Sequence, residues 1–191
     1  MTRGSLLIRD ATAQDADAIT SMVRDAMAAE ARLPSGSRLV LDPPGGPTPD
    51  FTAVIASPEF RTLLAIETGS GQIAGFAVTS ENLFSSLVGR PAIDVHYLVV
   101  PDQRRHRGVG RELLAAVTRF AEELSAEYVI VGVANESRDV NRYFAKAGFM
   151  PMEHRRVTTV GTLRRTLGLG QPVAARETAR RRIRGRSSSL G

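Results

Sequence analysis

The chain of 191 residues contains no cysteine, which excludes disulfide bonds, thiolate catalysis and cysteine-ligated metal sites. Its first 18 residues hold no apolar stretch of signal-peptide length. No later stretch has enough consecutive apolar residues to span a bilayer. From these absences we expect a cytoplasmic protein that does not enter the membrane.

Lysine is nearly absent, since Lys146 stands alone among 25 basic residues. The net charge of +5 has an uneven origin, because eight arginines and one acid lie in residues 164–191 and leave residues 1–163 slightly acidic. We therefore predict one domain over 1–163 and a basic, disordered tail over 164–191. Nucleic-acid binding is not expected except through this tail, because the domain lacks interleaved aromatics and a basic surplus.

Metal and nucleotide motifs are missing as well. The three histidines, His96, His106 and His154, are scattered along the chain, so no metal site is predicted. No Gly-Lys-Ser/Thr follows a glycine-rich turn, which argues against a P-loop. A dinucleotide-binding loop would need a third glycine and a place at the first strand.

The hydrophobic pattern predicts alternating strands and helices. A strand at 5–9 precedes a helix that Thr12 or Asp15 can cap, with Ile19, Val23, Ala26 and Met27 at helical spacing. A proline- and glycine-rich loop is expected at 33–50, followed by a hairpin formed by 60–67 and 72–79.

The second half continues with a strand at 92–100 and a strongly amphipathic helix after Gly110. An apolar run at 128–133 predicts a buried strand, a short helix follows from Ser137 to Ala147, and a weaker strand is expected at 157–162. This order indicates the α/β class, with a mixed central sheet flanked by helices.

One segment, 98–114, carries the chemistry. An apolar strand leads through Pro101 into the basic turn 104–107 and then, past Gly108 and Gly110, into a helix. The first turn of a helix presents unpaired N–H groups and partial positive charge, and glycines let a ligand approach the backbone. The segment therefore predicts a pyrophosphate site, whereas a plain tight turn with solvated arginines is the alternative.

This segment resembles the acyl-CoA loop of the GCN5-related N-acetyltransferase (GNAT) family, written R/Q-x-x-G-x-G/A. The matching residues are Arg105, Gly108 and Gly110, after a strand that ends near Pro101. A second hallmark of the family, an aromatic helix that ends in Gly-Phe, corresponds to 141–149. The order of elements over residues 5–163 also agrees with the family, so the resemblance implies its fold.

The resemblance implies transfer of an acetyl group from acetyl-CoA, as cosubstrate, to a primary amine by direct attack. The acceptor would be an amine-bearing small molecule or protein, and the oligomeric state is left open, a homodimer included. The residues expected to bind the cofactor lie on the central strand and the turn after it: Leu98, Val99, Val100, Arg105, His106, Arg107, Gly108, Val109, Gly110 and Arg111.

Proton transfer has three candidate side chains. Asp94 and His96 lie two residues apart on one strand and hence on one face, and histidine changes charge near neutral pH. Each has a structural alternative, a satisfied polar group at a strand edge for His96 and a structural carboxylate for Asp94. Glu153 and His154 are weaker candidates on the acceptor side.

The third candidate is Tyr143. The family often has a tyrosine four residues before the glycine of Gly-Phe, where it protonates the thiolate, but this chain has Phe144 there. One residue along a helix is a rotation of about 100°, so Tyr143 is expected to point elsewhere and to pack. This departure, together with one extra residue between Pro101 and Arg105, leaves a non-catalytic acyl-CoA-binding regulatory domain as the alternative function.

Overall fold

The computed structural model describes residues 5–30, 50–83, 85, 89–133, 138–152, 158 and 160–169. By its internal contacts the chain divides into two units, Met1–Phe149 and Met150–Gly191. The expected loop at 33–49, the candidates Glu153 and His154, and the tail from 170 onward lie outside the described residues.

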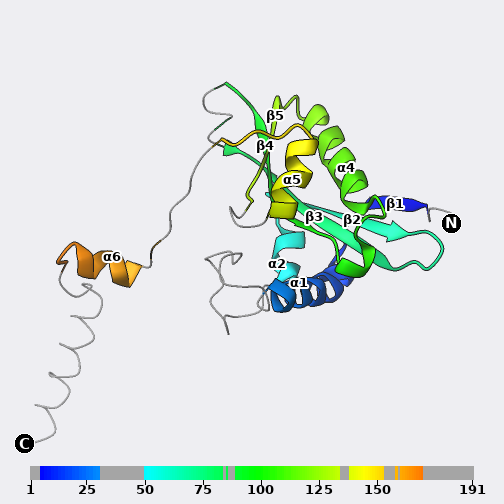
Figure 1. Cartoon of the computed structure of the whole chain (residues 1–191), viewed down its shortest axis with the longest axis horizontal. Helices are drawn as coiled ribbons and strands as arrows, with labels where there is room; N and C mark the ends of the chain where they lie inside the picture. Colours follow the sequence, from blue (N-terminus) through cyan, green and yellow to red (C-terminus); the bar gives the residue numbers. More distant parts are fainter. Residues whose placement is uncertain are drawn as a thin grey trace, which may run out of the picture. The chain divides into compact units, whose positions relative to one another are not determined.

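The first unit is built on a mixed five-stranded sheet with the order β1-β2-β3-β4-β5 (Figure 1). Antiparallel pairing joins the first four strands, and β5 is parallel to β4. The strands are β1 (Leu6–Asp10), β2 (Arg61–Glu67), β3 (Ile73–Glu81), β4 (Ala92–Val99) and β5 (Tyr128–Val131). This sheet confirms the predicted α/β class and the predicted β2–β3 hairpin.

Helices cover both faces of the sheet. The helices α1 (Ala16–Glu30) and α2 (Phe51–Ala56) enclose one core, in which Ile19 and Phe51 pack against Phe76. On the other face, α4 (Val109–Glu123) buries Leu113 and Val117 in a second core. The short helix α5 (Arg138–Lys146) follows β5, and Gly148, with φ 90°, lies just beyond its carboxyl end. In Figure 1, α4 and α5 lie close together in yellow-green and yellow.

The predicted start of the first helix is correct: a short 3₁₀ helix, η1 (Ala13–Asp15), leads into α1, and Thr12 and Asp15 form a capping box at its start. The Asp15 carboxylate accepts hydrogen bonds from the Thr12 N–H (2.7 Å) and hydroxyl (2.9 Å). Arg9 donates two further bonds of 2.8 Å each to the same carboxylate. These bonds, chiefly those from Arg9 and against the effect of burial, hold the pKa of Asp15 well below its usual range.

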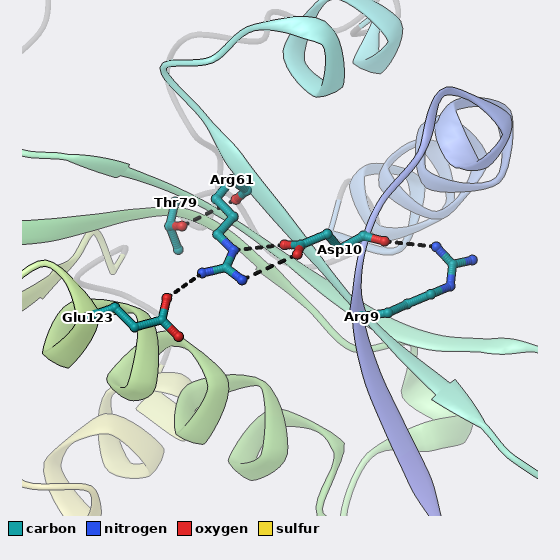
Figure 2. A network of polar contacts seen from close by, with 5 residues as sticks. All are labelled: Arg9, Asp10, Arg61, Thr79 and Glu123. Carbon is teal, nitrogen blue, oxygen red and sulfur yellow. Dashed lines mark hydrogen bonds and ion pairs between the residues drawn. The ribbon is translucent and has the colours of Figure 1, made fainter.

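The carboxyl end of α4 is tied to the sheet by Arg61. Figure 2 shows this guanidinium between two carboxylates, donating to Asp10 at 2.8 Å and to Glu123 at 3.1 Å. It also lies over the Phe120 ring, 4.7 Å from the centroid. At the other end of α4 the helix approaches Gly75 of β3 so closely that a Cβ there would stand 2.9 Å from Val109 Cγ1. Both ends of α4 are therefore fixed on the sheet.

Two expectations about elements need correction, and one helix was missed. The apolar run at 128–133 is an outer strand of the described sheet, not a buried one, and Tyr128 is 47% exposed. The expected strand at 157–162 is wrong for its last three residues, because Val160–Thr166 forms the helix α6. The helix α2 was not anticipated, although Asp50 caps it by accepting a bond from Thr52 N–H at 2.9 Å.

The second unit is described over α6 and a few neighbouring residues. Val160, Leu163 and Leu167 of this unit are all exposed. Of the helices that the structure describes, none has the length and apolar character needed to cross a membrane.

Candidate functional site

The pairing between β4 and β5 ends in the middle of β4. Pairing with β5 covers Ala92 to Val95 of β4, whereas pairing with β3 continues to Val99. The register with β3 also shifts here, since Val78 pairs with Tyr97 and Thr79 with Val95. His96 is therefore an extra residue in a β-bulge, a feature that bends a strand and reorients its side chains.

Beyond the bulge the β4 backbone is bonded on one side. Within the described residues, Leu98 and Val99 pair with β3, whereas the ladder with β5 ends at Val95. Their side chains are anchored in the cores on both faces, Leu98 with α4 and Val99 with α1 and α2. The strand can thus offer backbone groups along its β5 side while its side chains hold it in place, as the sequence predicts for Leu98–Val100.

The turn after β4 leads directly into the amino end of α4. A short 3₁₀ helix, η2 (Asp102–Arg104), is followed by His106 and Gly108, which have φ of 62° and 89°. The first helical bond runs from the Glu112 N–H to the Gly108 carbonyl at 3.0 Å. The N–H groups of residues 109–111 precede it, and the first turn of a helix is where donors face outward toward an anion.

The arginines of this turn are used in two different ways. Arg104 is ion-paired to Glu67 and donates a 2.6 Å hydrogen bond to Gln72 Oε1, so it is committed to the β2–β3 hairpin. Arg105 pairs with Asp102 at 2.9 Å, but 58% of its side chain is exposed. Arg107 and Arg111 are exposed too. The exposed arginines are the ones available to a phosphate.

The Tyr143 hydroxyl lies beside this turn. A Cβ added at Gly110 would stand 3.0 Å from the Tyr143 hydroxyl and 3.8 Å from Val100 Cγ2. Burial raises the pKa of Tyr143, so its phenol remains protonated at neutral pH. Helical rotation alone does not place Tyr143, because the docking of α5 sets which side of the helix meets α4.

Phe144 occupies the position that is often tyrosine in the family, and it is a core residue here. It is 6% exposed and packs edge-to-face against Phe149, with centroids 5.1 Å apart. The Phe149 N–H donates to the Phe144 carbonyl at 3.0 Å and the Gly148 N–H to Ala145 at 3.1 Å, a Schellman ending that needs the positive φ of Gly148. Phe144 brings no acidic hydrogen to the site.

Asp94 and His96 share the α1–α2 face, as predicted, but only His96 lies at the point where β4 and β5 part. Ser80 Oγ is 2.7 Å from His96 Nε2, and the Phe60 ring packs edge-to-face on the imidazole with centroids 5.5 Å apart. Asp94 lies within the β4–β5 ladder and accepts a 2.9 Å bond from Asn82 Nδ2. Sequence reasoning missed Ser80, Phe60 and Asn82, because cross-strand partners leave no local signal.

Two shallow hollows, of about 310 and 340 Å³, flank Arg61 at the other end of α4. The larger is lined in part by Phe60 and Ser80, the two residues that contact His96, and by Glu59 and Glu81. Neither hollow includes a residue of the turn before α4.

The turn fits the diphosphate of a coenzyme A. Gly108 has nothing within 4 Å of a Cβ built on it, so the backbone there is open to a ligand. The first-turn N–H groups and the exposed Arg105, Arg107 and Arg111 supply donors and positive charge of the kind phosphates need. The side chain of Val109 is buried in the core, so this residue offers its N–H alone.

Comparison with known proteins agrees with this geometry. The family model of the acetyltransferase (GNAT) family matches residues 30–149, and the chain belongs to this family. No curated protein sequence matches the chain.

Several solved structures share the fold at low identity. A putative acetyltransferase from Pyrococcus furiosus is 14% identical, with a TM-score of 0.63 over 82% of this chain and 100% of its own. The ribosomal-protein-alanine N-acetyltransferase of Brucella melitensis is 15% identical, with a TM-score of 0.63 over 81% and 99%. An aminoglycoside acetyltransferase from a soil metagenome, in complex with sisomicin, is 18% identical, with a TM-score of 0.55 over 81% and 93%.

Proposed function

We propose that this acetyltransferase-family protein transfers the acetyl group of acetyl-CoA to a primary amine by direct attack. The observation that carries the proposal is the placement of the α4 amino end at the end of β4, just beyond the point where β4 parts from β5. A ligand can there meet helix N–H groups with one end and the backbone of Leu98–Val100 with the other. Direct transfer depends mainly on such positioning.

The residues that would hold acetyl-CoA are the first turn of α4, with Gly108 and Gly110, and the exposed Arg105, Arg107 and Arg111. When bound, acetyl-CoA supplies a thioester carbonyl as the acyl donor. The β4 backbone beyond His96 would lie along the pantetheine arm and offer N–H donors to the carbonyl oxygen, a form of stabilisation that needs no particular side chain.

His96 is the proposed base, because it lies at the bulge and faces the α1–α2 side. Ser80 and Phe60 fix its ring from two directions, which a base requires for directed proton transfer. Asp94 is assigned a structural role through its bond with Asn82. The acceptor amine would approach past Phe60, because Glu59 and Glu81 line the same hollow as Phe60 and favour a cationic group.

Tyr143 is proposed to contact the cofactor and not to protonate its sulfur. Its hydroxyl lies beside Gly110 in the first turn of α4, where the diphosphate is expected, whereas the thioester is expected farther back along β4. A neutral phenol can donate a hydrogen bond to a phosphate oxygen.

The decisive test is release of free coenzyme A from acetyl-CoA in the presence of a panel of amines, with thermal stabilisation by acetyl-CoA measured in parallel. Ligand that binds only the native state raises the melting temperature, and Gly108→Asp, which puts a carboxylate at the anion site, should abolish the shift. Turnover on at least one amine supports the proposal. Stabilisation without turnover on any amine would instead support the non-catalytic acyl-CoA-binding domain, and no stabilisation would refute both.

The role of His96 is tested by the pH dependence of kcat/KM. His96→Ala should lose most activity at low pH, where an amine without a base is almost wholly protonated, and the ascending limb of the wild-type profile should move or vanish. A profile that His96→Ala leaves unchanged in shape would show that water carries the proton.

A further inference from the structure

We propose that Arg104 is a positioning residue that fixes the cofactor turn, residues 101–110, by tying it to the β2–β3 hairpin. The inference rests on the proposed function, because it assigns to that turn the binding of acetyl-CoA. Arg104 would act through the turn and would not itself contact the ligand.

The contacts of Arg104 set it apart from the other arginines of the turn. Its guanidinium is ion-paired to Glu67 and hydrogen-bonded to Gln72 Oε1 at 2.6 Å. The side chains of Arg104 and Glu67 are 19% and 25% exposed, against 58% and 64% for Arg105 and Asp102. A shielded pair is screened less by salt and water than an exposed one, so this contact can hold the turn, whereas the Arg105 pair can open.

The hairpin is a firm anchor for this tie. Glu67 N–H donates to the Gln72 carbonyl at 2.9 Å, and Gly71 N–H donates to the Glu67 carbonyl at 2.8 Å. Ser70 Oγ donates to Glu67 Oε2 at 3.0 Å, which orients the carboxylate whose other oxygen meets Arg104. The backbone and the side chain of Glu67 are thus both held by hydrogen bonds that do not involve Arg104.

The hydrogen bonds within the first half of the turn are local. Arg104 N–H donates to the Pro101 carbonyl at 2.8 Å and Arg105 N–H to Asp102 at 3.2 Å, and such local bonds shape a turn without fixing where it lies against the sheet. Residues 105–108 follow with two positive φ angles, at His106 and Gly108. Long-range contacts are needed to give such a segment one position. The buried Val109 side chain holds the end of the turn, and the ion pair of Arg104 with Glu67 holds its first half across 37 positions of the chain.

The same contacts argue against a direct role in phosphate binding. A phosphate could recruit Arg104 only by leaving Glu67, a quarter exposed, without its cation, and unpaired shielded charges are costly. Arg105 and Arg107 are exposed and need no such exchange.

The first experiment measures acetyl-CoA affinity and turnover for Arg104→Met, Glu67→Gln and the double variant. Because both single changes break the same tie, each should raise the KM for acetyl-CoA roughly tenfold with kcat little changed, and the double variant should be no worse than either one. Arg105→Met removes a residue proposed to contact the diphosphate directly, so its effect on the KM should multiply with that of Glu67→Gln. Arg119→Met, on an exposed part of α4, is the matched control for loss of an arginine.

The charge-swapped pair Arg104→Glu with Glu67→Arg should recover affinity over Arg104→Glu alone. Independent, multiplying effects of Arg104→Met and Glu67→Gln would overturn the inference and indicate that Arg104 meets the ligand directly.

A second measurement needs no ligand. Hydrogen exchange of the amides of 105–110 should be faster in Arg104→Met and Glu67→Gln than in the wild type, while the amides in the middle of β2 and β3 stay protected. Unchanged exchange in the turn would overturn the inference even if acetyl-CoA binds. A wild type that does not bind acetyl-CoA, but whose turn loosens in the variants, would refute the proposed function and leave the tie itself established.

Discussion

The hydroxyl of Tyr143 lies against Gly110, so close that a Cβ at position 110 would stand 3.0 Å from Tyr143 Oη and 3.5 Å from Cζ. The glycine therefore makes room for a side chain from another helix, in addition to keeping the backbone open to a ligand. Gly110 has no positive φ, so steric space and not backbone conformation is what an alanine would lack.

This relationship predicts a coupling between positions 110 and 143. Gly110→Ala should gain little stability in the wild type, because the contact with Tyr143 Oη offsets the helical preference for alanine, up to about 1 kcal/mol. In a Tyr143→Phe background the nearest atom is gone and the same change should stabilise. Urea unfolding of the four proteins measures the coupling, and purely additive free energies would contradict the contact.

A second glycine, Gly75, should tolerate no side chain at all. A Cβ there would stand 2.7 Å from the Val99 carbonyl oxygen and 2.9 Å from Val109 Cγ1, and a backbone atom of a central strand cannot move aside. Gly75→Ala should lower the free energy of unfolding by roughly 1–3 kcal/mol. Gly69→Ala, with nothing within 4 Å, is the matched control and should stay within about 0.5 kcal/mol of the wild type.

The cap of α1 predicts a pH dependence of stability. Because the pKa of Asp15 is lowered in the folded state, the unfolded chain binds more protons in acid than the folded chain does. The contribution of Asp15 to the free energy of unfolding is therefore complete above its unfolded pKa of about 4 and falls as the pH drops toward the folded pKa. Asp15→Asn keeps an acceptor for Thr12 but loses the charge that pairs with Arg9. This substitution should lower the free energy of unfolding by roughly 1.5–3 kcal/mol at pH 7. The difference in urea midpoint between the wild type and Asp15→Asn should narrow steadily below pH 4. A difference in urea midpoint that does not change with pH would show that packing and neutral hydrogen bonds, and not the charge of Asp15, stabilise this cap.

The pair of Arg105 and Asp102 predicts a gain of function. Asp102 engages Arg105 at 2.9 Å on the surface, so the cofactor must compete with a carboxylate for this arginine. Asp102→Asn should lower the KM for acetyl-CoA by up to about fivefold, since exposed pairs are worth about 0.2–1 kcal/mol. The gain should shrink as salt is added. Asp139→Asn, which breaks a comparable exposed pair with Arg142 on α5, should leave the KM unchanged.

The fold could be predicted from local signals, and the features that failed are those set by distant partners. The strand and helix periods around Ile19 and Leu113 report directly which faces are buried, and both are fully buried. The apolar run at 128–131 looks the same whether a strand is central or outer, because its neighbours are decided by topology. The helix at Val160–Thr166 begins at the last residue of the β-branched run VTTV, and the helix propensities of Val and Thr are only tenths of a kcal/mol poorer than those of better helix formers, so the run does not exclude a helix.

In the candidate site, the glycines and the exposed arginines of the turn were found because the motif is contiguous. The bulge at His96 was not, since an extra residue in β4 shows only in its register with β3. The tie between Arg104 and Glu67 joins positions whose sequence neighbourhoods have nothing in common. The direction of Tyr143 depends on how α5 docks, which helical rotation by itself does not determine.

The last prediction separates the two roles open to Tyr143. A general acid removed from an enzyme of this kind costs roughly 10²–10⁴-fold in kcat, whereas loss of a hydrogen bond to a bound cofactor weakens binding. Because the hydroxyl lies at the first turn of α4, Tyr143→Phe should raise the KM for acetyl-CoA several-fold and leave kcat within about threefold. The pKa of Tyr143 is raised above its usual value of about 10, so the phenol stays neutral and the effect on KM should be constant from pH 7 to 9. Tyr128→Phe, on the exposed edge of β5, is the matched control and should change neither constant. A fall of kcat by a hundredfold or more in Tyr143→Phe would instead make the phenol the acid, and would require the thioester to reach the amino end of α4.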